Sequence, residues 1–177
     1  MASILLQTIK NIGKVKHNVG SLNEWNKKVL NQGAIISGGD LDNFTLVELE
    51  FDADGNRIAK ALSASTKLGY LLASVEEYLD QYGETMSCFY NAVGERGRIV
   101  ILDVTNRFEA SNFEKADAVK EVKNGQKVHY DAAKKKFIIS NGVADHADYA
   151  AAANTYVVVG SGNSIDGQAL IRFEVSI

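Results

Sequence analysis

Short runs in which apolar and polar residues alternate occur along much of this chain and predict β-strands. The run Phe44–Phe51 is largely of this kind, with the charged residues Glu48 and Glu50 between apolar ones. Asp54-Gly55 follows it, and Arg57–Leu62 comes next. Because Asp-Gly tolerates the positive φ that a tight hairpin turn needs, the two runs are predicted to form an antiparallel hairpin.

Further strands are predicted on both sides of this hairpin. The strand-like runs are Ala34–Ser37, Arg98–Val104, Val119–Val122, Lys127–Tyr130, Phe137–Ser140, Thr155–Gly160 and Ala169–Ile177. Asn124-Gly125 supplies a second hairpin turn, just before the run that begins at Lys127. Phe108–Asp117, by contrast, is polar and is expected to be a loop.

One stretch has helical rather than alternating spacing. Between Lys67 and Asp80, the apolar residues that recur at steps of three and four are Leu68, Leu71, Leu72, Val75 and Leu79. This spacing predicts a helix near Leu68–Gln81, ended by Gly83. We expect its apolar face to pack against the strand Ile99–Leu102, so that Leu72→Asp or Val75→Asp would unfold the domain.

The first third of the chain is less regular. Ser21-Leu22-Asn23-Glu24 has the form of a capping box and predicts a second, short helix near Asn23–Asn31. Before it, Met1–Gly20 mixes apolar and basic residues without a settled period. This segment fits an arm that orders only on a partner, and it fits a first strand of the domain equally well.

These elements predict a mainly β (α+β) protein: an antiparallel β-sandwich or barrel-like body with one or two short helices and an N-terminal arm. We assign residues 1–20 to the arm and residues 21–177 to a single β-rich domain, since no linker divides the chain. Proline is absent, so the chain lacks a residue that commonly prevents exposed sheet edges from pairing with other chains. Either the edges are covered by the chain itself or by partner subunits, or the absence reflects composition alone.

Charge and hydropathy narrow the range of partners. A net charge of −3 argues against a nucleic-acid binder, which usually has a basic face. No apolar run approaches the roughly 20 residues needed to cross a bilayer, and Met1–Gln7 lacks the features of a secretory signal. The single cysteine, Cys88, allows no internal disulfide and is predicted to be a buried structural thiol. We therefore expect neither nucleic acid nor membrane as a partner.

Three polar clusters resemble functional sites, and each has a simpler structural interpretation. Asp52–Asn56 is similar to the opening of a calcium loop, but the later bidentate acid is missing and a hairpin turn accounts for it. Asp145–Asp148 offers three candidate metal ligands, yet an exposed polar loop is expected. Lys134–Lys136 is expected to be a solvated turn. The sequence therefore predicts no catalytic, cofactor-binding or metal-binding residue, and a protein that is not an enzyme.

Segments in the middle of the chain resemble structural proteins of tailed bacteriophages. The segments are Gly69–Glu77, Phe89–Ile99, Arg107–Phe113, Val122–Val128 and Phe137–Ser140. The nearest kind of protein is the auxiliary capsid protein, also called a decoration or cement protein. The likeness covers roughly Leu62–Asn141, about half of the chain.

This resemblance implies a non-enzymatic role at the capsid surface of the virion. Proteins of this kind bind the outside of an icosahedral shell, bridge neighbouring subunits of the major capsid protein and stabilise the shell. The resemblance also implies a homo-oligomer, often a trimer, with an arm that adds a strand to the shell.

Two alternatives stay open from the sequence. One is another virion component, such as a head fibre or a tail protein. The other is a carbohydrate-binding module that uses exposed aromatic residues. The aromatic residues considered for it are Trp25, Tyr70, Tyr78, Tyr82, Tyr90, Tyr130, Tyr149 and Tyr156.

Overall fold

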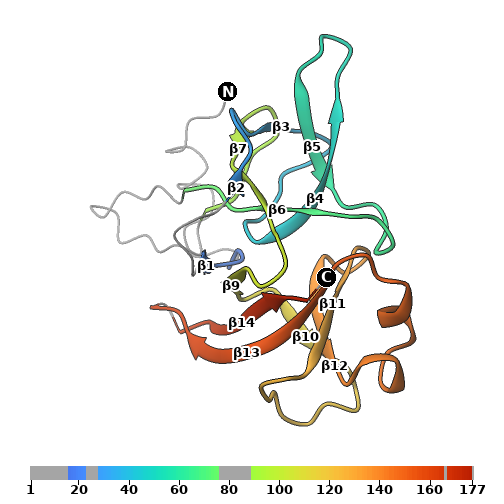
Figure 1. The fold of residues 1–177 in the computed structure, drawn as a ribbon. Helices are drawn as coiled ribbons and strands as arrows, with labels where there is room; N and C mark the ends of the chain where they lie inside the picture. Colours follow the sequence, from blue (N-terminus) through green and yellow to red (C-terminus); the bar gives the residue numbers. More distant parts are fainter. Residues whose placement is uncertain (1–15, 23–27, 76–88, 166, 177) are drawn as a thin grey trace.

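A computed structural model describes residues 16–22, 28–75, 89–165 and 167–176, and these form two seven-stranded sheets packed as a sandwich (Figure 1). Sheet A has the order β1 (Gly20–Leu22), β9 (Arg107–Ala110), β14 (Ala169–Val175), β13 (Thr155–Asn163), β11 (Lys127–Asp131), β12 (Lys136–Ser140) and β10 (Phe113–Lys115). Sheet B has the order β2 (Lys28–Val29), β8 (Ile99–Ile101), β6 (Tyr70–Leu72), β4 (Thr45–Phe51), β5 (Arg57–Ala61), β3 (Ala34–Ile36) and β7 (Arg96–Gly97). The pairing is antiparallel except for β10 with β12 and β3 with β5.

Two short 3₁₀ helices follow β12. They are η3 (Gly142–Ala144) and η4 (Ala147–Ala151). No helix in the described part of the chain is long and apolar enough to span a membrane. The mainly β prediction is therefore confirmed.

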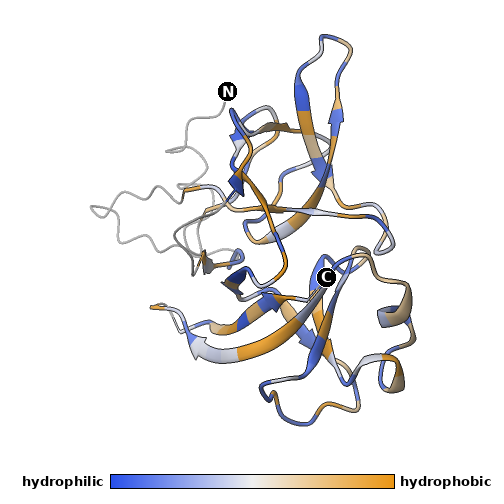
Figure 2. Cartoon of the chain, in the orientation of Figure 1, coloured by the Kyte–Doolittle hydropathy of each residue, from blue (hydrophilic) through white to orange (hydrophobic). Residues whose placement is uncertain are grey.

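The main core lies between the two sheets. Its buried side chains include Leu46, Leu71 and Val100 from sheet B and Phe108, Tyr130, Phe137, Tyr156 and Phe173 from sheet A. Hydrophobic residues follow the strands of both sheets, and hydrophilic residues mark many of the turns (Figure 2). Burial of this apolar surface is the main force that holds the two sheets together.

Sheet B is curled, because β7 at one end of its order and β8, the strand next to the other end, are separated in sequence by Arg98 alone. β7 pairs with β3, whereas β8 pairs with β2 and β6. The curl encloses a second apolar cluster, made of Ala34, Ile36, Leu41, Val47, Ala59, Leu72 and Ile99. A Cβ at Gly97 would lie 2.6 Å from Leu72 Cδ1 and 3.0 Å from Ile36 Cδ1, so a larger residue there would have to displace these two buried side chains.

Several predicted strands are confirmed. β4 and β5 pair from Val47↔Ala61 to Phe51↔Arg57, as the Asp-Gly turn predicts, and Gly55 has a φ of 80°. The other confirmed strands are β3, β8, β11, β12, β13 and β14, whose bounds differ from the predicted ones by a few residues. Local alternation and turn chemistry were sufficient signals for these elements.

The prediction of a helix near Leu68–Gln81 is wrong for its described part. Tyr70–Leu72 is strand β6, in which Leu71 lies opposite Val100 and Leu72 lies opposite Ile99. Leu71 faces the main core and Leu72 faces the second cluster, so both faces of this strand are buried. A strand buried on both faces gives a continuous apolar run, which helical spacing also matches. Residues 76–81 and Gly83 lie outside the described residues.

Other local predictions also fail. Lys28–Val29 is strand β2, so the prediction of a helix near Asn23–Asn31 is wrong for its described part. Residues 23–27 lie outside the described residues. Phe108–Asp117, expected to be a loop, contains most of β9 and all of β10. Val119–Val122 is irregular and packs Val119 against Ile138 on the outer face of sheet A.

The segment assigned to an arm is described only from Lys16 onward. Val19 is 1% exposed, and its backbone N–H donates to Ser111 Oγ at 3.0 Å. Ser111 N–H donates in turn to Val19 O at 2.9 Å, and β1 then pairs with β9. The last residues of the segment therefore belong to the packed body. An arm role for residues 1–15, which lie outside the described part, stays a prediction.

The pair Leu72→Asp and Val75→Asp tests whether the segment is a strand or a helix. Leu72 is fully buried, so Leu72→Asp should lower the free energy of unfolding by at least about 4 kcal/mol, through lost packing and an unpaired buried charge. Val75 is 63% exposed, so Val75→Asp should change it by less than about 0.5 kcal/mol. Urea denaturation followed by circular dichroism measures both. Equal destabilisation by the two variants would contradict the strand assignment.

Candidate functional site: a polar cavity where the two sheets meet

A cavity of about 340 Å³ opens where loops of sheet B meet the β11–β12 turn of sheet A. It is lined by Asn18, Asp40, Leu41, Asp42, Thr45, Asn112, Lys134, Lys135 and Lys136. The loop between β3 and β4 supplies the acidic residues, and the turn between β11 and β12 supplies basic ones. The lining is therefore polar and carries both signs of charge.

Asn112 joins the two sides of the cavity. Its Nδ2 donates to Phe44 O at 2.9 Å and to Lys135 O at 3.4 Å. Both accepting residues have a φ of 56°, a left-handed conformation that is uncommon outside glycine. The backbone carbonyl of Asn112 accepts a hydrogen bond from Phe137 N–H at 3.0 Å, which holds residue 112 beside β12. One buried side chain thus holds a strained residue from each sheet in place.

The acidic residues of the cavity already have protein partners. Asp40 Oδ1 accepts a hydrogen bond from Val93 N–H at 2.9 Å. Asp42 Oδ1 lies 2.6 Å from His17 Nδ1, and the His17 ring stacks on Tyr90 with centroids 5.2 Å apart. Burial, followed by the charge of Asp40, raises the pKa of the Tyr90 hydroxyl. This cluster ties the chain before β1 to loops of sheet B.

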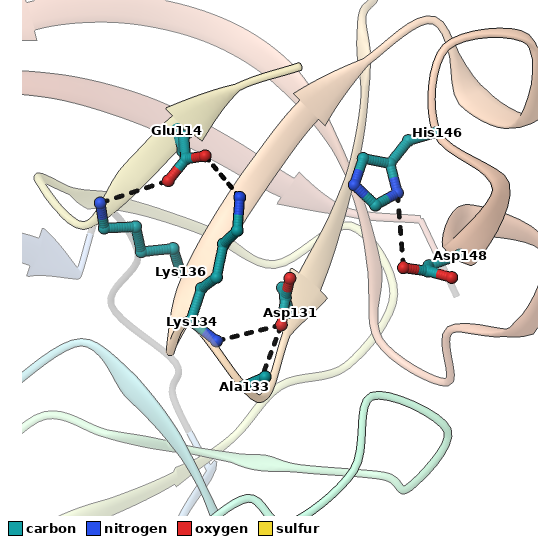
Figure 3. Close-up of polar contacts among 7 residues, drawn as sticks. All are labelled: Glu114, Asp131, Ala133, Lys134, Lys136, His146 and Asp148. Carbon is teal, nitrogen blue, oxygen red and sulfur yellow. Dashed lines mark hydrogen bonds and ion pairs between the residues drawn. The ribbon is translucent and has the colours of Figure 1, made fainter. Parts of the chain in front are cut away.

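The basic turn is neutralised on its outer side by Glu114 of β10. Glu114 binds Lys134 Nζ at 2.6 Å and Lys136 Nζ at 3.3 Å (Figure 3). The hydrogen bond from Lys134 is the main reason that the pKa of Glu114 lies below its ordinary value. Asp131 Oδ1 accepts the backbone N–H of Ala133 and of Lys134, which closes the turn. Because the three charged groups are exposed, these pairs position the turn more than they stabilise the fold.

Asp52–Asn56 forms the hairpin turn expected of it, whereas Asp145–Asp148 joins η3 to η4 instead of forming an exposed loop, and its His146 ring packs against His129. Asp52 Oδ1 accepts the N–H of Asp54 and of Asn56, and the Asn56 side chain lowers the pKa of Asp52. Asp145 Oδ2 accepts Asn141 N–H at the start of η3. Among the described residues, no group of three or more acidic, histidine or cysteine side chains is arranged to hold a metal ion. Cys88 lies outside the described residues.

The described members of the aromatic set considered for carbohydrate binding do not form a common exposed surface. Tyr130 and Tyr156 are 1% and 2% exposed, and both belong to the main core. Tyr70, Tyr90 and Tyr149 are half-buried. Trp25, Tyr78 and Tyr82 lie outside the described residues.

Two features of this site were missed by sequence reasoning. Asn112 stood in a span predicted to be a loop, and only the position of β12 makes its amide a bridge. The left-handed conformation of Phe44 carries no sequence signal, because an aromatic residue seldom adopts it. The two partners of Asn112 lie 68 and 23 residues away in the sequence, so no local pattern could bring them together.

The fold and this site define a small β-sandwich protein whose two sheets are bridged by polar loops around a cavity. A family model described as YonC prophage protein matches residues 13–176, and the chain belongs to this YonC prophage protein family. It is 44% identical over 180 residues to the SPbeta prophage-derived uncharacterized protein YonC of Bacillus subtilis (strain 168). That alignment covers 99% of this chain and 98% of the relative. No solved structure matches the chain. The phage association expected from the resemblance is confirmed.

Asn112→Ala tests the bridge between the sheets. The change leaves the carbonyl groups of Phe44 and Lys135 without this donor, so it should lower the free energy of unfolding by about 1–3 kcal/mol. Asn141→Ala is the matched control, since Asn141 is exposed and its side chain makes no capping hydrogen bond to η3. Chemical denaturation of both variants measures the difference. Equal stability of the two variants would show that the Asn112 side-chain amide does not stabilise the contact between the two sheets.

Proposed function

We propose that this protein is a non-enzymatic structural component of a tailed-phage virion, and specifically an auxiliary capsid protein. In this role it binds the outer surface of the shell and stabilises it. The phage association of the family supports the general part of the proposal. The resemblance over Leu62–Asn141 and the β-sandwich body support the specific part.

The observation that carries the proposal is the β4–β5 hairpin, which projects from the body (Figure 1). β6 pairs with β4 only as far as Val47, and β3 pairs with β5 only at Ile58 and Ala59. Among the described residues, Glu48–Phe51 therefore has no neighbouring strand on the edge away from β5. Because β3 adjoins β5 opposite Leu49 and Glu50, only the end of the hairpin, at the Phe51–Arg57 pair and the turn, is two-stranded.

The surface of the hairpin is suited to a protein partner. Phe51 is 68% exposed, and the Arg57 guanidinium lies 5.8 Å from the centroid of its ring. On the other face, Lys60 Nζ binds Glu50 at 2.6 Å. The edge of β4 at Glu48–Phe51 has no neighbouring strand among the described residues, so a strand added there by a partner would extend the ladder and cover Phe51.

The partner we propose is the major capsid protein, with the protein itself present as a homo-oligomer and a trimer as the expected form. Repeated copies on a lattice bind with avidity, so each hairpin contact can be weak. Binding that favours the assembled shell over free subunits raises the stability of the shell by linkage. The proposed location is thus the capsid surface of the virion.

The first test is whether the protein is a component of purified phage heads. We expect mass spectrometry to find it in heads and to find that heads without it open at a lower temperature. Its presence in tails or fibres alone would favour another virion component and reject the capsid role. Its absence from all particles would reject the virion role altogether.

Phe51→Ala tests the hairpin itself. Loss of a central aromatic contact should weaken cosedimentation of the protein with purified shells by about tenfold, which corresponds to about 1.4 kcal/mol. Ile165→Ala is the control, because Ile165 is fully exposed but lies in the β13–β14 turn. It should bind as the unchanged protein does. Equal binding by Phe51→Ala would show that the hairpin is not the contact.

A further inference from the structure

A pair of histidine rings lies on the outer face of sheet A, away from the cavity and the projecting hairpin. His129 of β11 is 0% exposed, and its ring centroid is 4.6 Å from that of His146, at an interplanar angle of 54°. Tyr149 of η4 meets His129 edge-on, with centroids 6.1 Å apart. The segment 142–152, called the cover here, thus places two rings over one buried imidazole.

Both ring nitrogens of His129 are buried, and neither has a hydrogen-bond partner among the described residues. His146 Nδ1 lies 3.8 Å from Asp148 Oδ2, an ion-pair distance that is too long for a hydrogen bond (Figure 3). Burying a neutral imidazole without partners costs free energy, and burying a charged one costs much more.

Charged groups approach His129 from two sides. On its own strand are Lys127, whose Nζ lies 5.5 Å from the centroid of the Tyr149 ring, and Asp131. The cover contributes His146 and Asp148. Burial is the main cause that lowers the pKa of His129, and His146 lowers it further, while the two aspartates act in the opposite direction. The net effect of these surroundings is to favour the neutral ring.

The cover is held to the sheet weakly. Within residues 140–152, the backbone N–H groups of Asn141, Gly142, Asp145, His146, Tyr149 and Ala152 donate only to groups of the same segment. η4 has no buried residue. The ring contacts with His129 and the contact of Lys127 with Tyr149 are therefore the main attachments of its middle part. Segments of this kind open at low free-energy cost, without global unfolding.

We propose that His129 and the cover form a pH-sensitive latch: the cover is closed while the buried His129 ring is neutral, and protonation of that ring releases it. Release exposes the outer face of β11 and frees Lys127 and Tyr149 for other contacts. The latch is independent of the capsid role proposed above and uses residues of neither the cavity nor the hairpin.

The direction of the pH dependence follows from linkage. In the closed state the pKa of His129 lies below the ordinary value of about 6.5 that it regains when the cover opens. The open state therefore binds more protons, and closure is favoured above pH 6.5 and lost as the pH falls below it. Between the two pKa values, the opening equilibrium should rise by up to about tenfold for each unit of pH.

Hydrogen exchange detected by mass spectrometry tests the latch in the full chain. We expect the protection of residues 142–152 to fall between pH 7.5 and 5.5, after correction for the intrinsic pH dependence of exchange, while β13 and β14 stay protected. Loss of protection in β13 and β14 at the same pH would indicate global unfolding and would overturn the proposal. Unchanged protection of residues 142–152 would overturn it as well.

His129→Phe supplies the specific variant, because it keeps a buried ring that cannot be protonated. In this variant the pH-dependent loss of protection should disappear. His17→Gln is the matched control, since it removes a histidine outside the latch, and it should keep the pH dependence. If His129→Phe retains the same pH dependence, the latch does not depend on His129.

NMR titration of the His129 ring in the unchanged protein gives a readout that needs no variant: a ring that titrates at or above pH 6.5 would overturn the proposal.

Discussion

The aromatic packing between the sheets is the interaction on which the other contacts of this protein depend. Phe108, Phe137, Tyr156 and Phe173 come from four different strands of sheet A, and their ring centroids lie 4.9–6.3 Å apart. The chain has one cysteine and so cannot form an internal disulfide. Burial therefore has to supply most of the stabilisation, and these large rings bury the most area per residue. The same burial raises the pKa of the Tyr156 hydroxyl.

The location of this core decides which parts of the chain are left for other contacts. Sheet B uses both of its faces for packing, one on the main core and one on the cluster inside its own curl. The outer part of the β4–β5 hairpin extends beyond both clusters and ends in an exposed Phe51. The end of the hairpin, unlike its base, contributes no buried residue to either cluster, so it can contact a partner without disturbing the fold. This separation fits the shell-binding role proposed for the hairpin.

Two regions outside the main core are held by different means. Where loops of sheet B meet the β11–β12 turn, Asn112 provides a buried link between backbone segments, and the charged groups around it are paired. On the outer face of sheet A, the cover rests on His129 mainly through ring contacts. The first arrangement resists opening because it would leave buried polar groups unpaired. The second is the one proposed to respond to a proton, because the buried nitrogens of its central ring have no hydrogen-bond partner among the described residues.

The sequence by itself determined the elements whose signals are local. Asp54-Gly55 predicted the β4–β5 hairpin, and alternation predicted β14. The sequence also indicated the phage association, although the capsid role stays a proposal. Only the tertiary structure decided that Leu71 and Leu72 lie in a strand, because their burial comes from two separate clusters on opposite faces of sheet B. The bridge made by Asn112 and the contact of His129 with His146 likewise join residues distant in sequence, and a local pattern carries no information about such neighbours.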